Sequence, residues 1–395
     1  MKHEERWKKI REIAPGGQGM VYLVRDKHKF DVGLMNLRKS MELLMRDSDE
    51  LKHKGFEDFQ NVIKEITQID NGYLGALKEL HSQKDARDFE LAEERIKREI
   101  QAMKSITHPN LIEVLDTDTD GKWFVTRYYN KGTLTKNSAS FTGNFPKALK
   151  AIRPLVEGVA KIHEAVNQAG DNLGMVHRDI KPDNIFVSDN NELILGDFGL
   201  VYYSEDKGKR LSNTIGNVGS TDWMPPWAAR RRVDEINPKF DIFCLAKTIW
   251  SMISDTPILP FWYYEDPEFN LECKFPNARY MSLANELFSK CIVEKEKDCK
   301  IENATEFLKA IDEIIGIIEN DADVVDISER VCGACGRGKY ELKVDQDDHV
   351  LGDYGLRSVG NRKFRIFVCD HCGHMLLFTG QGKVPEPWIT KKKDS

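Results

Sequence analysis

The sequence lacks the features that mark membrane and secreted proteins. No stretch approaches the roughly 18 consecutive apolar residues that a membrane span needs, and charged residues, rather than an apolar signal segment, follow Met1. Positive charge is not in excess either, since 58 Lys and Arg stand against 64 Asp and Glu, a formal net charge of −6. The chain as a whole therefore has no charge with which to condense on nucleic acid or anionic lipid. We expect a cytoplasmic protein without membrane contact.

Cysteine, glycine and proline are also scarce. Eight cysteines, 28 glycines and 14 prolines in 395 residues exclude a disulfide scaffold, a collagen-like chain and a low-complexity chain. Hydrophobic residues make up 41% and charged residues 31%, which is a globular composition. At roughly 100–200 residues per domain, the length predicts two or three folded units with room for an enzyme-sized core.

The pattern along the chain divides it into three parts. Residues 1–128 are mostly strand-like, with a helical insertion at about 31–70; residues 129–328 are mostly helical; residues 329–395 are strands punctuated by Cys and Gly, followed by a basic tail. Within the first part we expect strands at 7–13, 20–24 and 73–80, a helix over 84–105 and a hairpin over 111–128. Two apolar stripes in the insertion predict two short amphipathic helices.

Two motifs in the middle of the chain carry chemistry. Residues 175–184 read Met-Val-His-Arg-Asp-Ile-Lys-Pro-Asp-Asn, and Asp197-Phe198-Gly199 follows a short strand at 193–195. Here the sequence resembles the eukaryotic-type protein kinase family, with the Ser/Thr branch the closer match. The resemblance implies an α+β, bilobal kinase fold with a small β-rich N-lobe and a large helical C-lobe.

The same resemblance implies a role for each polar residue of the motifs. Asp179 would accept the proton of the substrate hydroxyl, and Lys181 would approach the γ-phosphate of ATP. Asn184 and Asp197 would hold Mg²⁺. Neutralising the clustered charge of ATP and aligning the hydroxyl are the two physical needs that these residues serve.

Upstream residues match the family's phosphate-binding parts in order. The segment Ala14, Gly16, Gly17, Gly19 and Val21 resembles the Gly-rich loop, in which missing Cβ atoms let backbone N–H groups approach phosphate oxygens. The first glycine of the family pattern is Ala14 here. Taken alone, this segment would equally fit an ordinary hairpin turn.

A lysine and a glutamate complete the expected nucleotide site. Lys78, in Ala76-Leu77-Lys78, resembles the lysine that grips the α- and β-phosphates, and Glu99 resembles its ion-pair partner on a helix. Glu99 lies nine residues before His108-Pro109, a spacing typical of the family.

The strand at 123–129 resembles the one that leads into the adenine-binding hinge. Thr126 would be the gatekeeper, and the backbone of Arg127 and Tyr129 would meet the adenine. Candidate walls of the pocket are Val21, Ala76 and Phe186, although apolar residues at such positions would fill a core equally well.

The chain departs from the family pattern near residue 227. Trp227 stands where the family has the glutamate that closes the peptide-docking segment, and the arginine that pairs with it is replaced by Lys300 or absent. Because losing both charges is easier to tolerate than losing one, we expect apolar packing around Trp227 to anchor this segment. Thr214 ranks first among the candidate phosphosites, and the insertion at 31–70 either docks on the N-lobe or binds a protein partner.

Four cysteines near the C-terminus form two Cys-x-x-Cys pairs, each followed by glycine: Cys332, Cys335, Cys369 and Cys372. Four thiolates on two tight turns suit tetrahedral Zn²⁺, which predicts a small zinc ribbon with a structural metal. His371 and His374 could substitute as ligands. Residues 329–395 contain 12 Lys/Arg and 9 Asp/Glu, a net of +3, too little for a strong general nucleic-acid site. We therefore favour a protein-docking or autoregulatory role for this module.

Taken together, the sequence predicts an ATP- and Mg²⁺-dependent serine/threonine protein kinase that phosphorylates protein hydroxyls, including its own, with Zn²⁺ as a structural ion. One alternative is a pseudokinase scaffold that uses the fold for binding alone; against it, none of the six catalytic positions is lost. The other is a kinase of small molecules, against which Lys181 and the peptide-docking segment argue.

Overall fold

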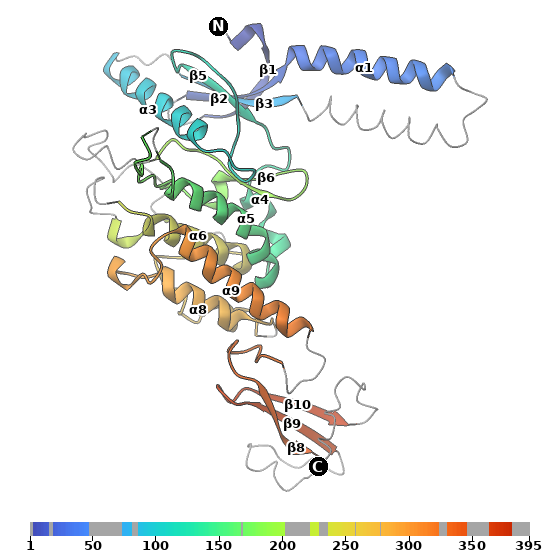
Figure 1. Cartoon of the computed structure of the whole chain (residues 1–395), viewed down its shortest axis with the longest axis vertical. Helices are drawn as coiled ribbons and strands as arrows, with labels where there is room; N and C mark the ends of the chain where they lie inside the picture. The colour runs from blue at the N-terminus through green and yellow to red at the C-terminus, as the bar shows by residue number, and fades with distance from the viewer. Residues whose placement is uncertain are drawn as a thin grey trace. The chain divides into compact units, whose positions relative to one another are not determined.

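The structure is a computed structural model of the chain. It describes residues 3–15, 19–46, 73–80, 86–166, 169–201, 222–228, 236–256, 258–276, 278–323, 330–345 and 363–380. The chain forms two compact units. The first comprises Met1–Asn137, Lys161–Gly219 and Arg232–Ile236, and the second comprises Ser138–Ala160, Ser220–Arg231 and Asn237–Ser395. Figure 1 labels many of the helices and strands.

The first unit contains a five-stranded antiparallel sheet with strand order β1-β2-β3-β5-β4. Its strands are β1 (Trp7–Pro15), β2 (Gly19–Asp26), β3 (Leu74–Leu80), β4 (Val114–Thr117) and β5 (Trp123–Arg127), preceded by a 3-10 turn, η1 (His3–Glu5). Alternation along these strands buries one face, on which a core cluster forms from Trp7, Val24, Leu77, Trp123 and Val125. The indole Nε1 of Trp7 donates to Asp116 Oδ2 at 2.8 Å, which fastens the first strand to the last one in the order.

Two long helices belong to this sheet's connections. Helix α1 (Lys27–Arg46) follows β2 directly, and Asp26 caps it, because its Oδ1 accepts the backbone N–H of Lys29 at 3.0 Å. Figure 1 shows α1 extending to one side of the sheet, and Met35 on it is 64% exposed. The first of the two predicted insertion helices is thus present, whereas the second lies outside the described residues.

Helix α3 (Ala86–Ser105) carries a buried face at helical spacing. Ala92, Ile96, Ile100 and Met103 are buried, and Glu99 is buried among them. The helix ends shortly before His108-Pro109, as predicted. The hairpin β4–β5 turns at Gly121, whose positive φ of 73° suits glycine.

Beyond the sheet, the described residues of the first unit include a short helix, a 3-10 turn and a small hairpin. They are α4 (Leu134–Asn137), the 3-10 turn η4 (Pro182–Asn184), β6 (Ile185–Val187) and β7 (Leu193–Leu195). Strand β7 is tied to the segment after α3, since Leu195 N–H donates to the Asn110 carbonyl at 2.8 Å and Ile112 N–H donates to the Leu195 carbonyl at 2.9 Å. These bonds fix the residues on either side of β7, where the two motifs lie.

The second unit is mostly helical. Its elements are η3 (Ser138–Phe141), most of α5 (Phe145–His163), η7 (Pro226–Ala228), α6 (Lys239–Ser254), α7 (Leu271–Lys274), α8 (Met281–Cys291), η9 (Glu296–Asp298) and α9 (Ala304–Asp323). Every residue of α6 from Phe240 to Ser254 is buried, so this helix is enclosed on all sides. Of the residues the structure covers, no helix is both long and apolar enough to cross a bilayer.

The same unit ends in a three-stranded antiparallel sheet of order β10-β9-β8. Its strands are β8 (Tyr340–Asp345), β9 (Lys363–Cys369) and β10 (Met375–Gly380). Strand-like patterns at 340–344 and 362–368 predict the first two of these strands, whereas no strand was predicted for β10. A small core of Cys332, Tyr340, Phe367 and Cys369 lies where this sheet meets the cysteine turns.

Candidate functional site

The segment after His177 holds a buried carboxylate in a fixed position. Lys181 Nζ lies 2.8 Å from Asp179 Oδ1 and 3.0 Å from Oδ2, and Asn184 Nδ2 donates to Oδ2 at 2.7 Å and to the Asp179 carbonyl at 2.8 Å. The local fold explains this geometry. Lys181 is extended and Pro182 opens the turn η4, which carries Asn184 back toward Asp179. Each oxygen of the carboxylate therefore accepts a charge-assisted or amide hydrogen bond.

His177 connects this segment to the second motif. Its Nδ1 accepts the Asp179 N–H at 3.3 Å, so Nε2 carries the proton and donates to the Gly196 carbonyl at 3.1 Å. The ring also meets Phe198 edge to face, with centroids 4.8 Å apart. Gly196 N–H in turn donates to the Asn184 carbonyl at 2.9 Å. The two motifs are thus joined directly before Asp197.

Asp197 lies beside the lysine and glutamate that are expected to pair. Its backbone has a positive φ of 55°, unusual for a residue with a side chain, and its Oδ1 accepts Gly199 N–H at 3.4 Å. A Cβ added to Gly199 would stand 3.2 Å from Asp197 Oδ1 and 3.6 Å from Glu99 Oε2, so both carboxylates lie close to this glycine.

Lys78 and Glu99 form a buried, two-pronged ion pair. Lys78 Nζ donates to Glu99 Oε1 at 2.9 Å and to Oε2 at 2.7 Å, and the side chains are 16% and 3% exposed. Burial alone would lower the pKa of Lys78, but the carboxylates of Glu99 and Asp197 outweigh it and raise that pKa. Burial raises the pKa of Glu99, Lys78 opposes the rise and Asp197 adds to it. The raised pKa of Lys78 favours its charged form.

The expected adenine-facing residues come from neighbouring strands. In the sheet register Ala76 lies opposite Thr126, which is 5% exposed, and Val21 lies opposite Lys78. Arg127 N–H donates to the Glu113 carbonyl at 3.3 Å, and the Tyr129 carbonyl accepts Gly132 N–H at 3.0 Å.

Phe186 also belongs to this group. Its ring stacks on Tyr129 with centroids 5.6 Å apart, and burial raises the pKa of Tyr129 to about 12. A Cβ on Gly196 would lie 2.6 Å from the Phe186 ring, so only glycine lets this backbone approach so closely.

Parts of the predicted site lie outside the described residues. Gly16 and Gly17 are among them, as is the candidate phosphosite Thr214. The flanking backbone is described, and Ala14 pairs with Val21 in the β1–β2 register, with Gly19 beginning β2.

The segment 222–228 is described and confirms the expected packing of Trp227. The indole of Trp227 meets Phe243 of α6 edge to face, with centroids 5.3 Å apart and an interplanar angle of 85°. Lys300, the residue considered as a charge partner, is exposed. An aromatic contact therefore stands where the resemblance implies an ion pair.

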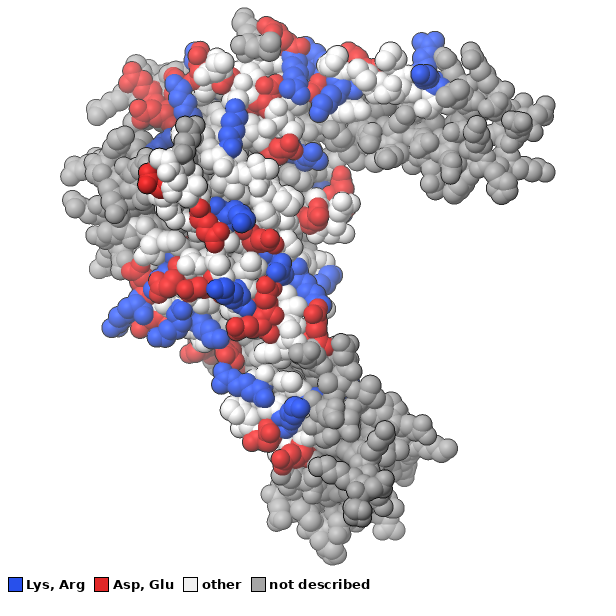
Figure 2. Space-filling view, viewed as in Figure 1, with Lys and Arg blue, Asp and Glu red and all other residues white. Residues whose placement is uncertain are grey.

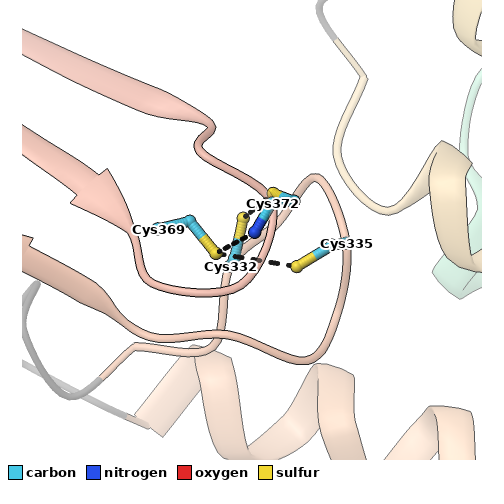
Figure 3. A group of neighbouring side chains, drawn as sticks. All are labelled: Cys332, Cys335, Cys369 and Cys372. Carbon is cyan, nitrogen blue, oxygen red and sulfur yellow. Dashed lines mark hydrogen bonds between the residues drawn. The ribbon is translucent and has the colours of Figure 1, made fainter.

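The four predicted cysteines come together, as Figure 3 shows. All four sulfur atoms lie within 4.8 Å of one another, with Cys332–Cys372 and Cys335–Cys369 each 3.7 Å apart. These distances exclude disulfides, whose sulfurs are about 2.05 Å apart. A tetrahedron with Zn–S bonds of about 2.3 Å has edges of about 3.8 Å, so the four thiols fit a zinc ion.

Glycine shapes both cysteine turns. Gly336 and Gly373 follow the second cysteine of each pair with positive φ of 66° and 74°, and each donates its N–H to the carbonyl of the first cysteine, at 2.7 and 3.1 Å. Backbone N–H groups also point at sulfur, as Cys372 N–H does toward Cys369 at 3.5 Å. His374 Nδ1 lies 2.8 Å from the Tyr340 hydroxyl, so it is engaged there rather than in the cluster.

The first cysteine turn also contacts α8. Tyr280 N–H donates to the Gly333 carbonyl at 3.3 Å, and Arg337 Nη2 lies 2.8 Å from Glu286 Oε1. A Cβ on Gly336 would stand 2.0 Å from Leu283 Cδ2, so the turn packs its glycine directly on the helix.

Charge on the described surface is mixed. Figure 2 shows basic and acidic side chains interspersed on the face in view.

One buried charge was not predicted from the sequence. Lys247 lies in the enclosed helix α6 and is 1% exposed. A lysine inside the apolar run 240–253, four residues after Phe243, was the available signal, because i and i+4 share a helix face.

The chain matches the family model of the protein kinase domain over residues 57–310. A probable serine/threonine-protein kinase, samkA of Dictyostelium discoideum, is 31% identical over 41% of this chain and 24% of its own. A probable serine/threonine-protein kinase of Clostridium acetobutylicum is 24% identical over 80% of this chain and 41% of its own. An Aurora kinase of Eremothecium gossypii is 27% identical over 58% of this chain and 59% of its own. The chain thus spans less than two thirds of the length of each of these relatives.

Proposed function

The chain belongs to the protein kinase domain family, and on that premise we propose that it transfers the γ-phosphoryl group of ATP to serine or threonine hydroxyls of proteins, its own included. One observation carries the proposal: the Asp179 carboxylate, held by Lys181 and Asn184, belongs to the same compact unit as the Lys78–Glu99 ion pair and Asp197. A proton acceptor, phosphate-binding cations and metal-binding oxygens are the groups that phosphoryl transfer needs together.

Each side chain has a task that its contacts support. Asp179 orients the acceptor hydroxyl and takes its proton, while Asn184 keeps the carboxylate from rotating. Lys181 compensates the negative charge that gathers between the nucleophile and the γ-phosphate. Lys78, aimed by Glu99, binds the phosphates.

Mg²⁺ would be held by Asn184 and Asp197, and when bound it neutralises the charge of the phosphates. The residues present fit this ion, because a carboxylate and an amide supply hard oxygen ligands. The carbonyl of Arg127 and the N–H of Tyr129 are the backbone groups that would meet the adenine, between walls formed by Val21, Ala76 and Phe186.

A single-turnover assay with γ-labelled ATP tests the proposal. Wild-type protein should label serine and threonine in a mixed-sequence peptide pool and in itself, and Asp179→Asn should lose about 100- to 10,000-fold in rate, the usual contribution of general acid–base catalysis. Asp183→Asn is a matched control, because this neighbouring carboxylate bonds Thr135 and not the catalytic groups. Equal rates for wild type and Asp179→Asn would refute the enzyme, and label on small molecules alone would refute a protein substrate.

For the C-terminal part, we propose a structural Zn²⁺ site formed by Cys332, Cys335, Cys369 and Cys372. The near-tetrahedral sulfur spacing supports it. Elemental analysis of the purified chain should find about one zinc per chain, and Cys335→Ser should lose it. Cys273→Ser, which changes an exposed cysteine outside the cluster, is the control that should keep the metal.

We also retain the division proposed from the sequence: an N-lobe over 1–128 with an insertion at about 31–70, a C-lobe over 129–328 and a zinc module over 329–395. The exposed apolar side chains of α1, Leu34 and Met35 among them, support a protein partner at the insertion.

A further inference from the structure

Lys247, in the middle of helix α6, is a buried lysine. Lys247 is 1% exposed and has apolar residues of the helix on both sides in sequence, Ala246 and Ile249 among them. An ammonium group taken out of water costs free energy unless its donors find partners. The contacts of Lys247 should therefore indicate why a lysine occupies this buried position.

The contacts of Lys247 lead to the segment 222–228. Its Nζ donates a short hydrogen bond to the backbone carbonyl of Asp222. The same nitrogen lies 5.9 Å from the ring centroid of Trp223 and 5.4 Å from that of Phe243, within cation–π range of both. No other lysine within the described helices is enclosed to this extent.

Two neighbours on α6 hold the same segment. Cys244 Sγ donates to the Trp223 carbonyl at 3.3 Å, and Phe243 meets the Trp227 indole at 5.3 Å. Residues 243, 244 and 247 lie on one face of the helix. That face contacts residue 222, residue 223 and residue 227, so both ends of the segment are fastened to it.

We propose that Lys247 is a positioning residue that fixes the backbone of segment 222–228 for the acceptor peptide. The inference rests on the proposed function, since that function makes 222–228 the peptide-docking segment. Trp227 has replaced the acidic end of this segment, so a charged anchor from the segment itself is missing. The buried ammonium of Lys247 supplies a charged anchor from α6 instead. It binds the main-chain carbonyl of residue 222, which is present whatever side chain stands at that position.

The contacts favour positioning over a general packing role. A methionine of similar volume would fill the space of Lys247, so the ammonium is not needed to fill the core. Its single donated hydrogen bond in the described structure goes to the segment rather than to another part of the helical unit. Loss of the ammonium should therefore loosen 222–228 first.

The test compares Lys247→Met with Thr248→Val. Thr248 is equally buried on the same helix turn, but its hydroxyl donates within α6, to the Cys244 carbonyl at 2.9 Å. For Lys247→Met we expect the KM for an acceptor peptide taken from the labelled pool to rise roughly tenfold, the size expected for one charge-assisted hydrogen bond. The KM for ATP should change less than about twofold, because the Lys78 and Asp179 groups are untouched. Thr248→Val should match wild type in both.

A second measurement follows the segment directly. Amide hydrogen exchange within 222–228 should quicken in Lys247→Met while α6 and α8 keep their protection. An unchanged peptide KM with unchanged exchange, or equal rises in both KM values, would overturn the proposal. Lys247→Leu is the second variant if methionine does not pack. Failure of both to fold while Thr248→Val folds would also overturn it, because Lys247 would then serve folding of the whole unit.

The two proposals fail separately. A wild-type protein that transfers no phosphate refutes the kinase activity, and the exchange measurement still decides whether Lys247 fixes the segment. If wild type is active and Lys247→Met leaves the peptide KM and the exchange of 222–228 unchanged, only the positioning role is refuted.

Discussion

The buried ammonium of Lys247 should make the stability of the protein depend on pH in a specific range. Burial lowers its pKa from 10.5 to about 8, against the opposing influence of Cys244 and the Asp222 carboxylate. In the unfolded chain the ammonium is solvated and keeps its ordinary pKa. Above pH 8 the folded protein has released this proton while the unfolded chain still binds it, so stability must rise with pH until the unfolded lysine also titrates.

The size of the effect follows from the difference between the two pKa values. Each pKa unit corresponds to about 1.4 kcal/mol, so keeping the ammonium buried below pH 8 costs about 3 kcal/mol of unfolding free energy. Between pH 7 and pH 10 we expect about 2–3 kcal/mol of this cost to disappear. Lys247→Met has no proton to release. The unfolding free energy of wild type minus that of the variant should therefore increase by this amount between pH 7 and pH 10.

Urea unfolding at several pH values, followed by tryptophan fluorescence, measures that difference; Trp223, Trp227, Trp250 and Trp262 lie in the described part of the second unit. Taking wild type minus variant removes the titration of every group that the two share. Lys297→Met, at an exposed position, is the control and should follow the wild-type profile. A wild-type minus Lys247→Met difference that stays constant from pH 7 to pH 10 would show that Lys247 is not desolvated as described.

Three further predictions concern the other sites. Glu99→Gln removes the carboxylate that orients Lys78 and should lower kcat/KM for ATP roughly 10- to 100-fold, the range for a charged hydrogen bond. An unchanged value would show that the Lys78–Glu99 pair does not contribute to the use of ATP. A zinc chelator should speed amide exchange in β8, β9 and β10 while β1 to β5 keep their protection, and equal exchange with and without chelator would argue against a structural metal. Arg337→Ala and Glu286→Gln should show a coupling energy below about 1 kcal/mol in a double-mutant cycle, because the pair is partly exposed; a larger value would make this ion pair the main contact of the cysteine turn with α8.

The sequence predicted best those features that are decided locally. Asp179 and Asn184 are five residues apart within one turn, so their contact follows from the motif itself. The glycines after each cysteine pair likewise indicated tight turns, and the four sulfurs do converge. Lys78 and Glu99 are 21 residues apart, and only the resemblance to a known family predicted that their side chains meet.

Features set by tertiary packing were harder to foresee. Apolar packing of Trp227 was predicted from the loss of a charge, but its partner Phe243 could not be named, since it depends on how the segment lies on α6. The contact between Arg337 and Glu286 joins residues 51 apart through two side chains that carry no pattern. Strand β10 was missed because Met375–Phe378 is continuously apolar and lacks the alternation of polar and apolar residues that marks a half-buried strand.

The two enclosed lysines show how the choice of partner sets the behaviour of a buried cation. Lys78 has the Glu99 carboxylate within 2.7 Å, and its pKa is raised, so it stays charged throughout the range in which enzymes are assayed. Lys247 has a carbonyl and two aromatic rings, which accept a hydrogen bond and attract a cation without neutralising it, and its pKa lies at about 8. Raising the pH from 7 to 9 should therefore weaken the hold on segment 222–228 while leaving the Lys78–Glu99 ion pair intact. If Lys247 fixes that segment, the KM for peptide should rise over this range in wild type, relative to Lys247→Met, and the KM for ATP should show no such difference.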